Sequence, residues 1–353
     1  MIALDAMGGD YAPNVTVHGA IGAAKRGIHV ALFGDEPRLR HLLDEAEPTW
    51  QSLPITISHC TQTIAMGEEP TRGVLKKTDS SLVRAVHAVA DGVAHAVVSA
   101  GNSGAALAAG TLIIGRVEDV ARPAIGGLLP TRNGYVFCAD LGATTDCKPE
   151  YLEQFALMGH VYAQQHLGIA HPRIALLSNG HEPYKGSSVV KQAYALLVQR
   201  RDITFVGNLE ARDIFEGHAD VLVCDGFTGN IMLKTIQGTL REMATQIKQE
   251  VQSSWIYKVA FAMNRGIVTR LKSANTYRDQ GRALMLGLQK PMIIAHGCSS
   301  ATAIEDALLF ADQMVRDQFL VRYNYQLSML MRVSSHAALQ RTLPDSHVQT
   351  ELR

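Results

Sequence analysis

The chain has 353 residues, 47% of them hydrophobic and 19% charged, and its 33 Lys and Arg residues balance 33 Asp and Glu residues. That length and apolar content suit one large α/β unit or two lobes, and the balanced charge excludes a nucleic-acid binder that acts through overall charge. The five cysteines form no CxxC pair, which predicts reduced thiols in a cytoplasmic protein rather than a disulfide framework.

Short apolar, β-branched runs alternate along the chain with glycine-rich breaks and helical patterns. The first run, residues 2–4, leads into Asp5 and a Gly-Gly pair, and Pro13 suits the first turn of the helix that follows. Further runs, each with its break, occupy residues 28–34, 94–104, 173–180, 219–230 and 291–300. Continuous apolar strands that alternate with helices predict a mainly parallel sheet covered on both faces, which is a three-layer α/β fold.

Residues 231–275 interrupt this alternation, because two helical patterns follow each other without a strand between them. The break falls near residues 252–254, which predicts a helical hairpin inserted into the α/β core. Its second arm has no acidic residue from 251 to 278 and carries the cations Lys258, Arg265, Arg270 and Lys272. This arm suits an anionic membrane surface, and a helix buried against a second copy of the chain is the alternative. We expect residues 1–340 to form a single α/β unit, of one or two lobes, and residues 341–353 to be a flexible tail.

The ends of the expected strands collect glycine and small polar residues. The first strand is followed by Gly8 and Gly9, and a later strand is followed by Asn102, Ser103 and Gly104. Glycines let the backbone approach a ligand, and free N–H groups at a following helix start favour an anion. We therefore predict that these residues bind phosphate in a cleft beyond the carboxyl ends of the strands.

Three further loops are expected at the same cleft, namely residues 178–186, 225–230 and 296–300. The first of them carries Asn179 and Lys185. Their amide and ammonium groups suit an anionic oxygen such as that of phosphate.

Several other kinds of site are disfavoured. The chain has no GxGxxG, no Gly-Lys dipeptide and no HExxH, so we expect no dinucleotide, Walker-type or zinc site, and no cofactor or metal. Asp5, Asp10 and Asp225 would repel phosphate and are interpreted as caps or loop organisers. Ser103 follows a strand as a hydrolase nucleophile does, but its GxSxG spacing is incomplete, which favours a helix cap that also contacts an anion.

The segments DAMGGDYAP, SAGNSGA, DCKPE, LLSNGHEPYKG, DVLVCDGFTGN and HGCSS occur in this order within residues 2–315. In these loops the sequence resembles the PlsX family of bacterial phosphate acyltransferases. The resemblance implies a Rossmann-like αβα fold similar to those of phosphotransacetylase and isopropylmalate dehydrogenase. It also implies transfer of a fatty acyl group from acyl carrier protein to inorganic phosphate, which gives acyl phosphate for phospholipid biosynthesis.

The resemblance further implies a cytoplasmic homodimer that associates peripherally with the inner face of the membrane, near the downstream membrane glycerol-3-phosphate acyltransferase. Acyl carrier protein is acidic, so the basic arm is an expected docking surface for it as well. Bound phosphate would attack the thioester directly, with Lys185 and Asn179 as catalytic residues. A coenzyme A-dependent phosphate acyltransferase and a non-catalytic α/β protein that binds a carrier protein or a membrane are the alternatives.

A few residues depart from the family pattern. Ser103 stands where Thr is expected, which keeps the hydroxyl, and Thr144 stands where Asn is expected. Arg282 and Leu284 stand where Gly and Pro are more frequent. These departures affect the fine shape of the site and leave the main loops undisturbed.

Overall fold

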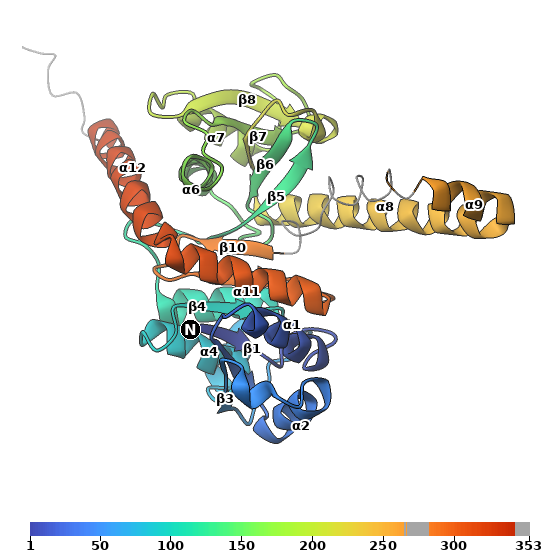
Figure 1. Ribbon diagram of the computed structural model, residues 1–353. Coiled ribbons are helices and arrows are strands. Elements are labelled where there is room, and N and C mark those ends of the chain that lie inside the picture. Colours follow the sequence, from blue (N-terminus) through green and yellow to red (C-terminus); the bar gives the residue numbers. More distant parts are fainter. Residues whose placement is uncertain (265, 267–281, 343–353) are drawn as a thin grey trace, which may run out of the picture.

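The protein is built on one continuous sheet, seen in a computed structural model that describes residues 1–264, 266 and 282–342. The sheet is 11-stranded, with the order β3-β2-β1-β4-β11-β10-β5-β6-β9-β7-β8 (Figure 1). In that order the strands are Ile55–His59, Val30–Gly34, Ile2–Asp5, Ala96–Ser99, Met292–Ala295, Arg282–Leu286, Ala124–Thr131, Gly134–Ala139, Val221–Val223, Arg173–Ser178 and Thr204–Glu210.

Most neighbouring strands are parallel, as the alternation of strands and helices in the sequence predicts. The exceptions lie in the middle of the sheet. There β10 runs antiparallel to both β11 and β5, and β5 runs antiparallel to β6. The predicted α/β class with a mainly parallel sheet is confirmed, and β10 joins the two halves of the sheet.

Helices cover both faces of this sheet (Figure 1). The helices are α1 Asn14–Lys25, α2 Glu36–Ala46, α3 Pro70–Lys76, α4 Ser81–Ala90, α5 Ser103–Ala109, α6 Pro149–His166, α7 Ser188–Leu197, α8 Gly226–Ser253, α9 Trp255–Met263, α11 Ala301–Arg316 and α12 Phe319–Thr342. Short helical turns occur at η1 Trp50–Ser52, η2 Gly110–Ile114 and η3 Ala211–Glu216.

The two faces have separate apolar cores because successive side chains of a strand point in opposite directions. In β1, Ile2 and Leu4 pack in the core formed with α1, α2, α6, α7, α11 and α12. Ala3, between them, belongs to the core formed with α4 and α5. This burial on both faces explains why the strands read as unbroken apolar runs in the sequence.

Local sequence signals start the helices that follow these strands. The side chains of Asp35, Ser187 and Ser300 accept hydrogen bonds from backbone N–H groups in the first turns of α2, α7 and α11. Asp225 does the same for α8, and α1 begins directly after Pro13. Polar caps therefore turn the chain from strand to helix at one edge of the sheet, which is where the site is built.

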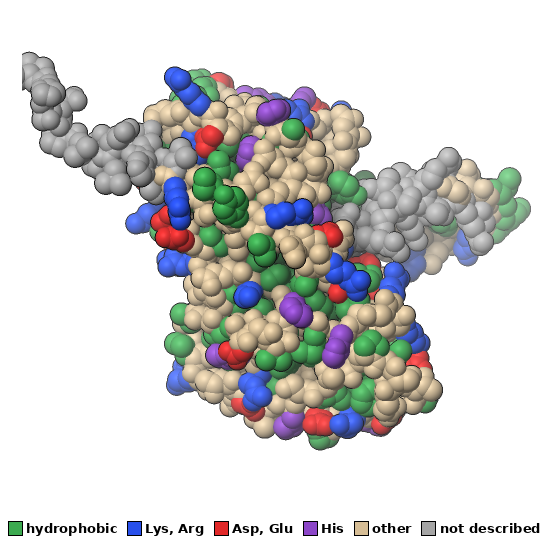
Figure 2. All heavy atoms as spheres, turned by 60° about the vertical axis from the view of Figure 1, so that its left-hand side comes forward, with side chains coloured by type: hydrophobic (Ala, Val, Ile, Leu, Met, Phe, Trp, Pro, Cys, Tyr) green, Lys and Arg blue, Asp and Glu red, His purple; other side chains and the backbone are tan. Residues whose placement is uncertain are grey.

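The predicted helical hairpin is present. α8 has 28 residues; the side chains buried along it lie near its start, and the rest of the helix projects from the body with α9 beside it (Figure 1). The break between α8 and α9 falls at Ser254, inside the predicted range. We call residues 240–264 the arm; they comprise the end of α8, which carries Glu242 and Glu250, and the described part of the second arm expected from the sequence. Figure 2 shows hydrophobic side chains at its far end, whereas Lys, Arg, Asp and Glu side chains are interspersed over the body.

Some sequence predictions fall beyond what the structure describes. Arg265, Arg270 and Lys272 lie outside the described residues, whereas Lys258 is described and exposed. Of the expected tail, residues 341 and 342 belong to α12 and the remainder lies outside the described residues. Among the helices of the described residues, none combines the length and apolar character needed to cross a bilayer.

Candidate active site

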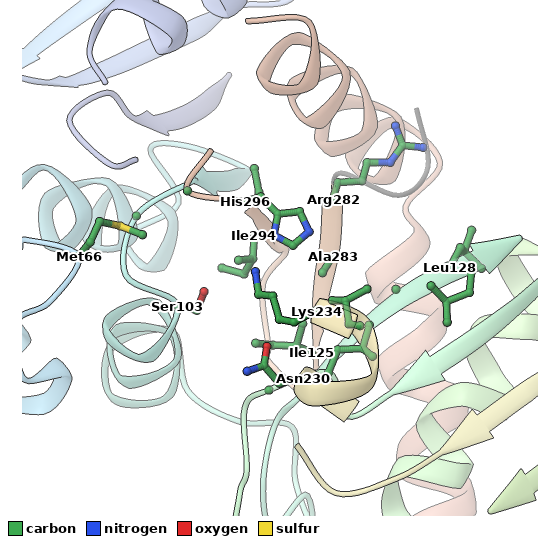
Figure 3. A pocket seen from close by; sticks show the side chains of 18 residues that line it. Met66, Ser103, Ile125, Leu128, Asn230, Lys234, Arg282, Ala283, Ile294 and His296 are labelled. Carbon is green, nitrogen blue, oxygen red and sulfur yellow. The ribbon is translucent and has the colours of Figure 1, made fainter. Parts of the chain in front are cut away.

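A cavity of about 280 Å³ lies between the two halves of the sheet, at the edge where β4, β6 and β11 end (Figure 3). Loops after these strands supply part of its wall, and β5, β10 and the start of α8 supply the rest. The lining residues are Met66, Gly101, Ser103, Ile125, Gly127, Leu128, Leu129, Leu141, Gly142, Asn230, Leu233, Lys234, Arg282, Ala283, Ile294, Ala295, His296 and Gly297. This is the position at which open α/β sheets bind ligands.

Asp5 organises the first wall of the cavity from beneath. Its carboxylate is buried and accepts hydrogen bonds from the hydroxyls of Ser81, at 2.6 Å, and Ser99, at 2.8 Å. Burial raises the pKa of Asp5, and these hydrogen bonds offset part of the rise. The interpretation of Asp5 as a loop organiser is therefore confirmed, since its buried carboxylate is bonded to Ser81 and Ser99.

Glycines allow the loops of this wall to touch. A Cβ on Gly8 would lie 2.4 Å from Asp5 Oδ2 and 2.9 Å from the backbone nitrogen of Gly101, so only glycine fits. Gly9 has a φ of +120° and lies beside the carbonyl oxygen of Gly297. The structure thus brings together the loops after β1, β4 and β11, as the sequence predicts.

Two of the predicted phosphate-binding residues after β4, Asn102 and Ser103, differ from each other in their surroundings. The side chain of Asn102 caps α5 by accepting from Ala105 N–H, and its amide nitrogen donates to the carbonyl oxygens of Met66 and Glu68. Asn102 is therefore fully engaged in joining two loops. Ser103 is exposed and lines the cavity, so its hydroxyl is available to a ligand.

Asp140 organises the opposite wall in the same way as Asp5. Its buried carboxylate accepts hydrogen bonds from the backbone N–H groups of Ile125, Gly142, Ala143 and Thr144. Burial raises the pKa of Asp140, and these N–H donors act in the opposite direction. Thr144 contributes its backbone, so its departure from the family pattern leaves this anchor intact.

The first turns of α8 form a partition between two hollows. Asn230, Leu233 and Lys234 face the cavity described above. On the other side, Ile231 and Met232 line a larger, mainly apolar hollow of about 850 Å³ against α7 and η3. Helical periodicity accounts for the split, since residues three or four apart share a face.

Lys234 and His296 give the cavity its polar character (Figure 3). The Lys234 ammonium has no ion pair or hydrogen bond among the described residues, and in Figure 3 it points into the cavity. Burial lowers the pKa of His296, and the positive charge of Lys234 lowers it further. Arg282 turns its guanidinium out of the cavity and over the ring of Phe310, with 4.2 Å from Cζ to the ring centroid.

The two residues predicted to be catalytic lie elsewhere. Asn179 lines the larger hollow, and its Oδ1 accepts a hydrogen bond from Gly186 N–H at 2.8 Å. Lys185 packs its carbons beside Gly180 and places its Nζ 5.9 Å from the centroid of the Tyr184 ring. Lys185 lines neither of the two hollows. The structure therefore separates this loop from the cavity that holds Ser103, and the catalytic roles stay predictions.

Sequence reasoning placed Asn230 at the cleft, as the end of the loop 225–230, but missed Lys234 and Gln237 on α8. The signal was present, because counting helical turns from the cap at Asp225 places all three on one face. The described residues include no group of three or more His, Cys, Asp or Glu side chains placed to hold a metal ion. The cavity thus offers a cation, a hydroxyl, an imidazole and an apolar wall, which suit an anion beside an apolar group.

Comparison with known proteins assigns the family. A profile of the family described as "Fatty acid synthesis protein" matches residues 1–322. The chain is 45% identical over 323 residues to the phosphate acyltransferase of Geobacillus thermodenitrificans, covering 90% of this chain and 96% of that protein. The chain belongs to the PlsX family. A second PlsX-family relative, the phosphate acyltransferase of Pelotomaculum thermopropionicum, is 43% identical over 320 residues, covering 90% and 92% of the two chains.

Solved structures show the same fold for this PlsX-family chain. A phosphotransacetylase from Streptococcus pyogenes matches with a TM-score of 0.57 and 16% identity, covering 89% of this chain and 94% of that one. A branched-chain phosphotransacylase from Enterococcus faecalis matches with a TM-score of 0.52 and 17% identity, covering 89% and 100%. The expected similarity to the phosphotransacetylase fold is confirmed. With the family relatives above, the PlsX-family chain is an acyltransferase that acts on phosphate.

Proposed function

We propose that this PlsX-family enzyme transfers a fatty acyl group from the thioester of acyl carrier protein to inorganic phosphate, and that the acyl phosphate feeds phospholipid biosynthesis. One observation carries the proposal: a single cavity combines the Lys234 ammonium and the Ser103 hydroxyl with an apolar wall. The polar groups suit phosphate, and the wall, which includes Leu128 and Leu233, suits the carbons next to the thioester.

The proposed chemistry requires positioning more than activation. Phosphate is anionic at neutral pH, so one of its oxygens attacks the thioester carbonyl carbon directly, and the carbonyl electron pair moves onto oxygen. When that pair returns, the C–S bond breaks, and the thiolate leaves and later takes a proton from water. Thiols have a pKa of about 8.5, so the thiolate is a good leaving group. The Lys234 ammonium stabilises negative charge on the reacting oxygens.

The test measures thiol release from purified protein, with long-chain acyl thioesters of acyl carrier protein and of coenzyme A as alternative donors. We expect release only when phosphate is present, trapping of acyl phosphate by hydroxylamine, and faster turnover of the carrier-protein thioester. Preference for the coenzyme A thioester would instead identify a coenzyme A-dependent phosphate acyltransferase. No phosphate-dependent release from either donor would overturn the proposed activity.

We also propose that the arm binds an anionic membrane surface or acidic acyl carrier protein. Its support is the exposed apolar group of Trp255, Ile256 and Met263 next to the exposed cation Lys258. Such a surface combines apolar burial with attraction to negative charge. The enzyme would then act in the cytoplasm at the inner face of the membrane, where a membrane glycerol-3-phosphate acyltransferase consumes its product.

A homodimer is the remaining part of the proposal. The exposed apolar side chain of Tyr325 on α12 supports a partner surface on the body of the protein. Sedimentation velocity measures the state directly, and a single monomeric species over the micromolar range would contradict the dimer.

A further inference from the structure

The ring of His296 is held by a contact with Gln237 of α8. Nε2 of His296 lies 2.8 Å from the amide nitrogen of Gln237. An amide nitrogen can only donate, so the imidazole Nε2 accepts in this contact. A neutral ring that accepts at Nε2 carries its proton on Nδ1.

The surroundings favour the neutral form of this ring. Burial lowers the pKa of His296, and Lys234 on α8 lowers it further. Arg282 on β10 lines the same cavity. Asp10 lies near Gly297, the residue that follows His296, because its carboxylate oxygen would be 3.3 Å from a Cβ on Gly297. None of the described residues forms a hydrogen bond with Nδ1 of His296. The Nδ1–H group is therefore a free donor on a ring that lines the reaction cavity.

We propose that His296 is a catalytic residue that donates a hydrogen bond from Nδ1–H to a substrate oxygen in the cavity, and that Gln237 is a positioning residue that fixes this tautomer. The inference rests on the proposed acyl transfer and assigns one role within it. Phosphate is already anionic, so the step needs a donor for the oxygen that gains charge and no base. His296 neither takes nor releases a proton when the C–O bond forms and the C–S bond breaks.

The first experiment observes the ring without relying on activity. Protein labelled with ¹⁵N-histidine is recorded by long-range ¹⁵N–¹H correlation from pH 6 to 8, and the His296 signals are assigned by their loss in His296→Asn. We expect a neutral ring with the proton on Nδ1, and a change in the Nδ1 signal when inorganic phosphate is added. A proton on Nε2, a doubly protonated ring at pH 7, or an Nδ1 signal indifferent to phosphate would each overturn the proposal.

The second experiment separates a donor from a base. The amide nitrogen of Asn can occupy the place of Nδ1 and donate, but Asn cannot accept a proton from phosphate. Loss of one such donor lowers kcat by roughly a hundredfold, which we expect for His296→Ala. His296→Asn should retain most of kcat, and an Asn variant as slow as the Ala variant would assign the ring to base catalysis instead.

A third variant tests the positioning role of Gln237. Gln237→Glu replaces the donor with a carboxylate that can only accept, which moves the proton to Nε2 and favours the charged ring. We expect the His296 signals of this variant to titrate between pH 6 and 8 and the pH profile of kcat to differ from that of the unaltered protein. Unchanged signals and an unchanged profile would overturn the role of Gln237. If the unaltered protein transfers no acyl group at all, the proposed function fails, whereas the nuclear magnetic resonance experiment still decides the state of the ring.

Discussion

The backbone of Gly229 in α8 passes so close to the carbonyl oxygen of Asp140 that a Cβ at residue 229 would lie 1.9 Å from that oxygen. Asp140 also holds the loop that forms one wall of the cavity, through its bonds to Gly142 and Thr144. This contact fixes the start of α8, and therefore Lys234, relative to that wall.

Gly229→Ala should shift the first turns of α8 and lower both stability and activity. The atom that the new Cβ meets is backbone, so it cannot move aside as a side chain could, and a loss of roughly 3 kcal/mol is expected. Gly238→Ala is the matched control on the same helix, because nothing lies within 4 Å of its Cβ position. There the change should stabilise the protein by up to about 1 kcal/mol. Urea unfolding measures both, and equal effects of the two variants would contradict the contact.

Lys234→Ala should raise KM for phosphate and lower kcat, because the unpaired ammonium is lost from the cavity. The expected loss in kcat is roughly a hundredfold, the effect of removing one group that stabilises an oxyanion. Lys191→Ala on α7 is the control, since that lysine is exposed and lines neither hollow. Steady-state kinetics with varied phosphate provide the measurement, and parallel behaviour of the two variants would remove Lys234 from the site.

Much of the fold follows from local signals in the sequence. The apolar runs, the helix starts after Asp35, Ser187 and Ser300, and the break near Ser254 all depend on neighbouring residues. The antiparallel arrangement of strands at the centre of the sheet does not follow from such local signals. β5 spans Ala124–Thr131 and contains glycines and a proline without alternation, and strand direction there depends on partners far away in the chain.

Only part of the site was predictable, because some of it depends on strand order and some on the packing of distant elements. Loops after parallel strands meet at one edge of a sheet, so the meeting of Gly8 with Gly101 was predictable. The absence of Lys185 from the lining of the cavity with Ser103 was not predictable, because it depends on how the chain packs around α8. Motif content identified the loop of Lys185, but only tertiary structure shows that Asn179 and Gly186 of this loop line the larger hollow.

The role of Lys185 is tested by two substitutions. If the family motif makes it catalytic, Lys185→Ala should lower kcat by roughly a hundredfold with little change in stability. Lys185→Arg should recover only part of that loss, because a planar guanidinium does not reproduce a compact ammonium. Single-turnover rates of acyl phosphate formation are the measurement. Near-normal rates in Lys185→Ala would show an ordinary loop lysine, in agreement with its absence from the lining of the cavity.

Lys258→Glu should weaken binding of the enzyme to vesicles that contain anionic lipid. One lysine near such a surface contributes about 1 kcal/mol, so reversing its charge should cost about twice that. Lys191→Glu makes the same change of net charge away from the arm and should have little effect. Vesicle sedimentation at low and high salt measures both. If Lys258→Glu binds as well as the unaltered protein at every salt concentration, the membrane role of the arm is excluded.

The Arg200–Asp202 ion pair should make stability depend on pH in the acid range. Arg200 is nearly buried, pairs with Glu153 at 2.9 Å and also contacts Asp202. Burial raises the pKa of Asp202, but the hydrogen bond and charge of Arg200 outweigh it and hold that pKa below 3.8. The charged form is therefore favoured by folding, so the contribution is present above pH 3.8 and is lost as the pH falls through the lower folded value.

Asp202→Asn should accordingly lower the free energy of unfolding at pH 7 by roughly 1 to 2 kcal/mol. The difference from the unaltered protein should shrink as the pH falls below 3.8. Asp146→Asn, at an exposed site, should show a small effect at every pH. Urea unfolding across this range is the measurement, and a difference that grows in acid would reverse the assigned sign.

The place of β11 in the sheet has a consequence for the order in which the chain can fold. β11 lies between β4 and β10, and α11, which follows it, packs on α1. Residues 292–316 thus complete the half of the sheet begun by residues 2–99. During synthesis the first strands emerge long before these partners. Their edge beside β11 therefore stays unpaired until nearly the whole chain has been made. Such distant pairings give a high contact order, which favours slow folding and makes the growing chain a natural client for chaperones.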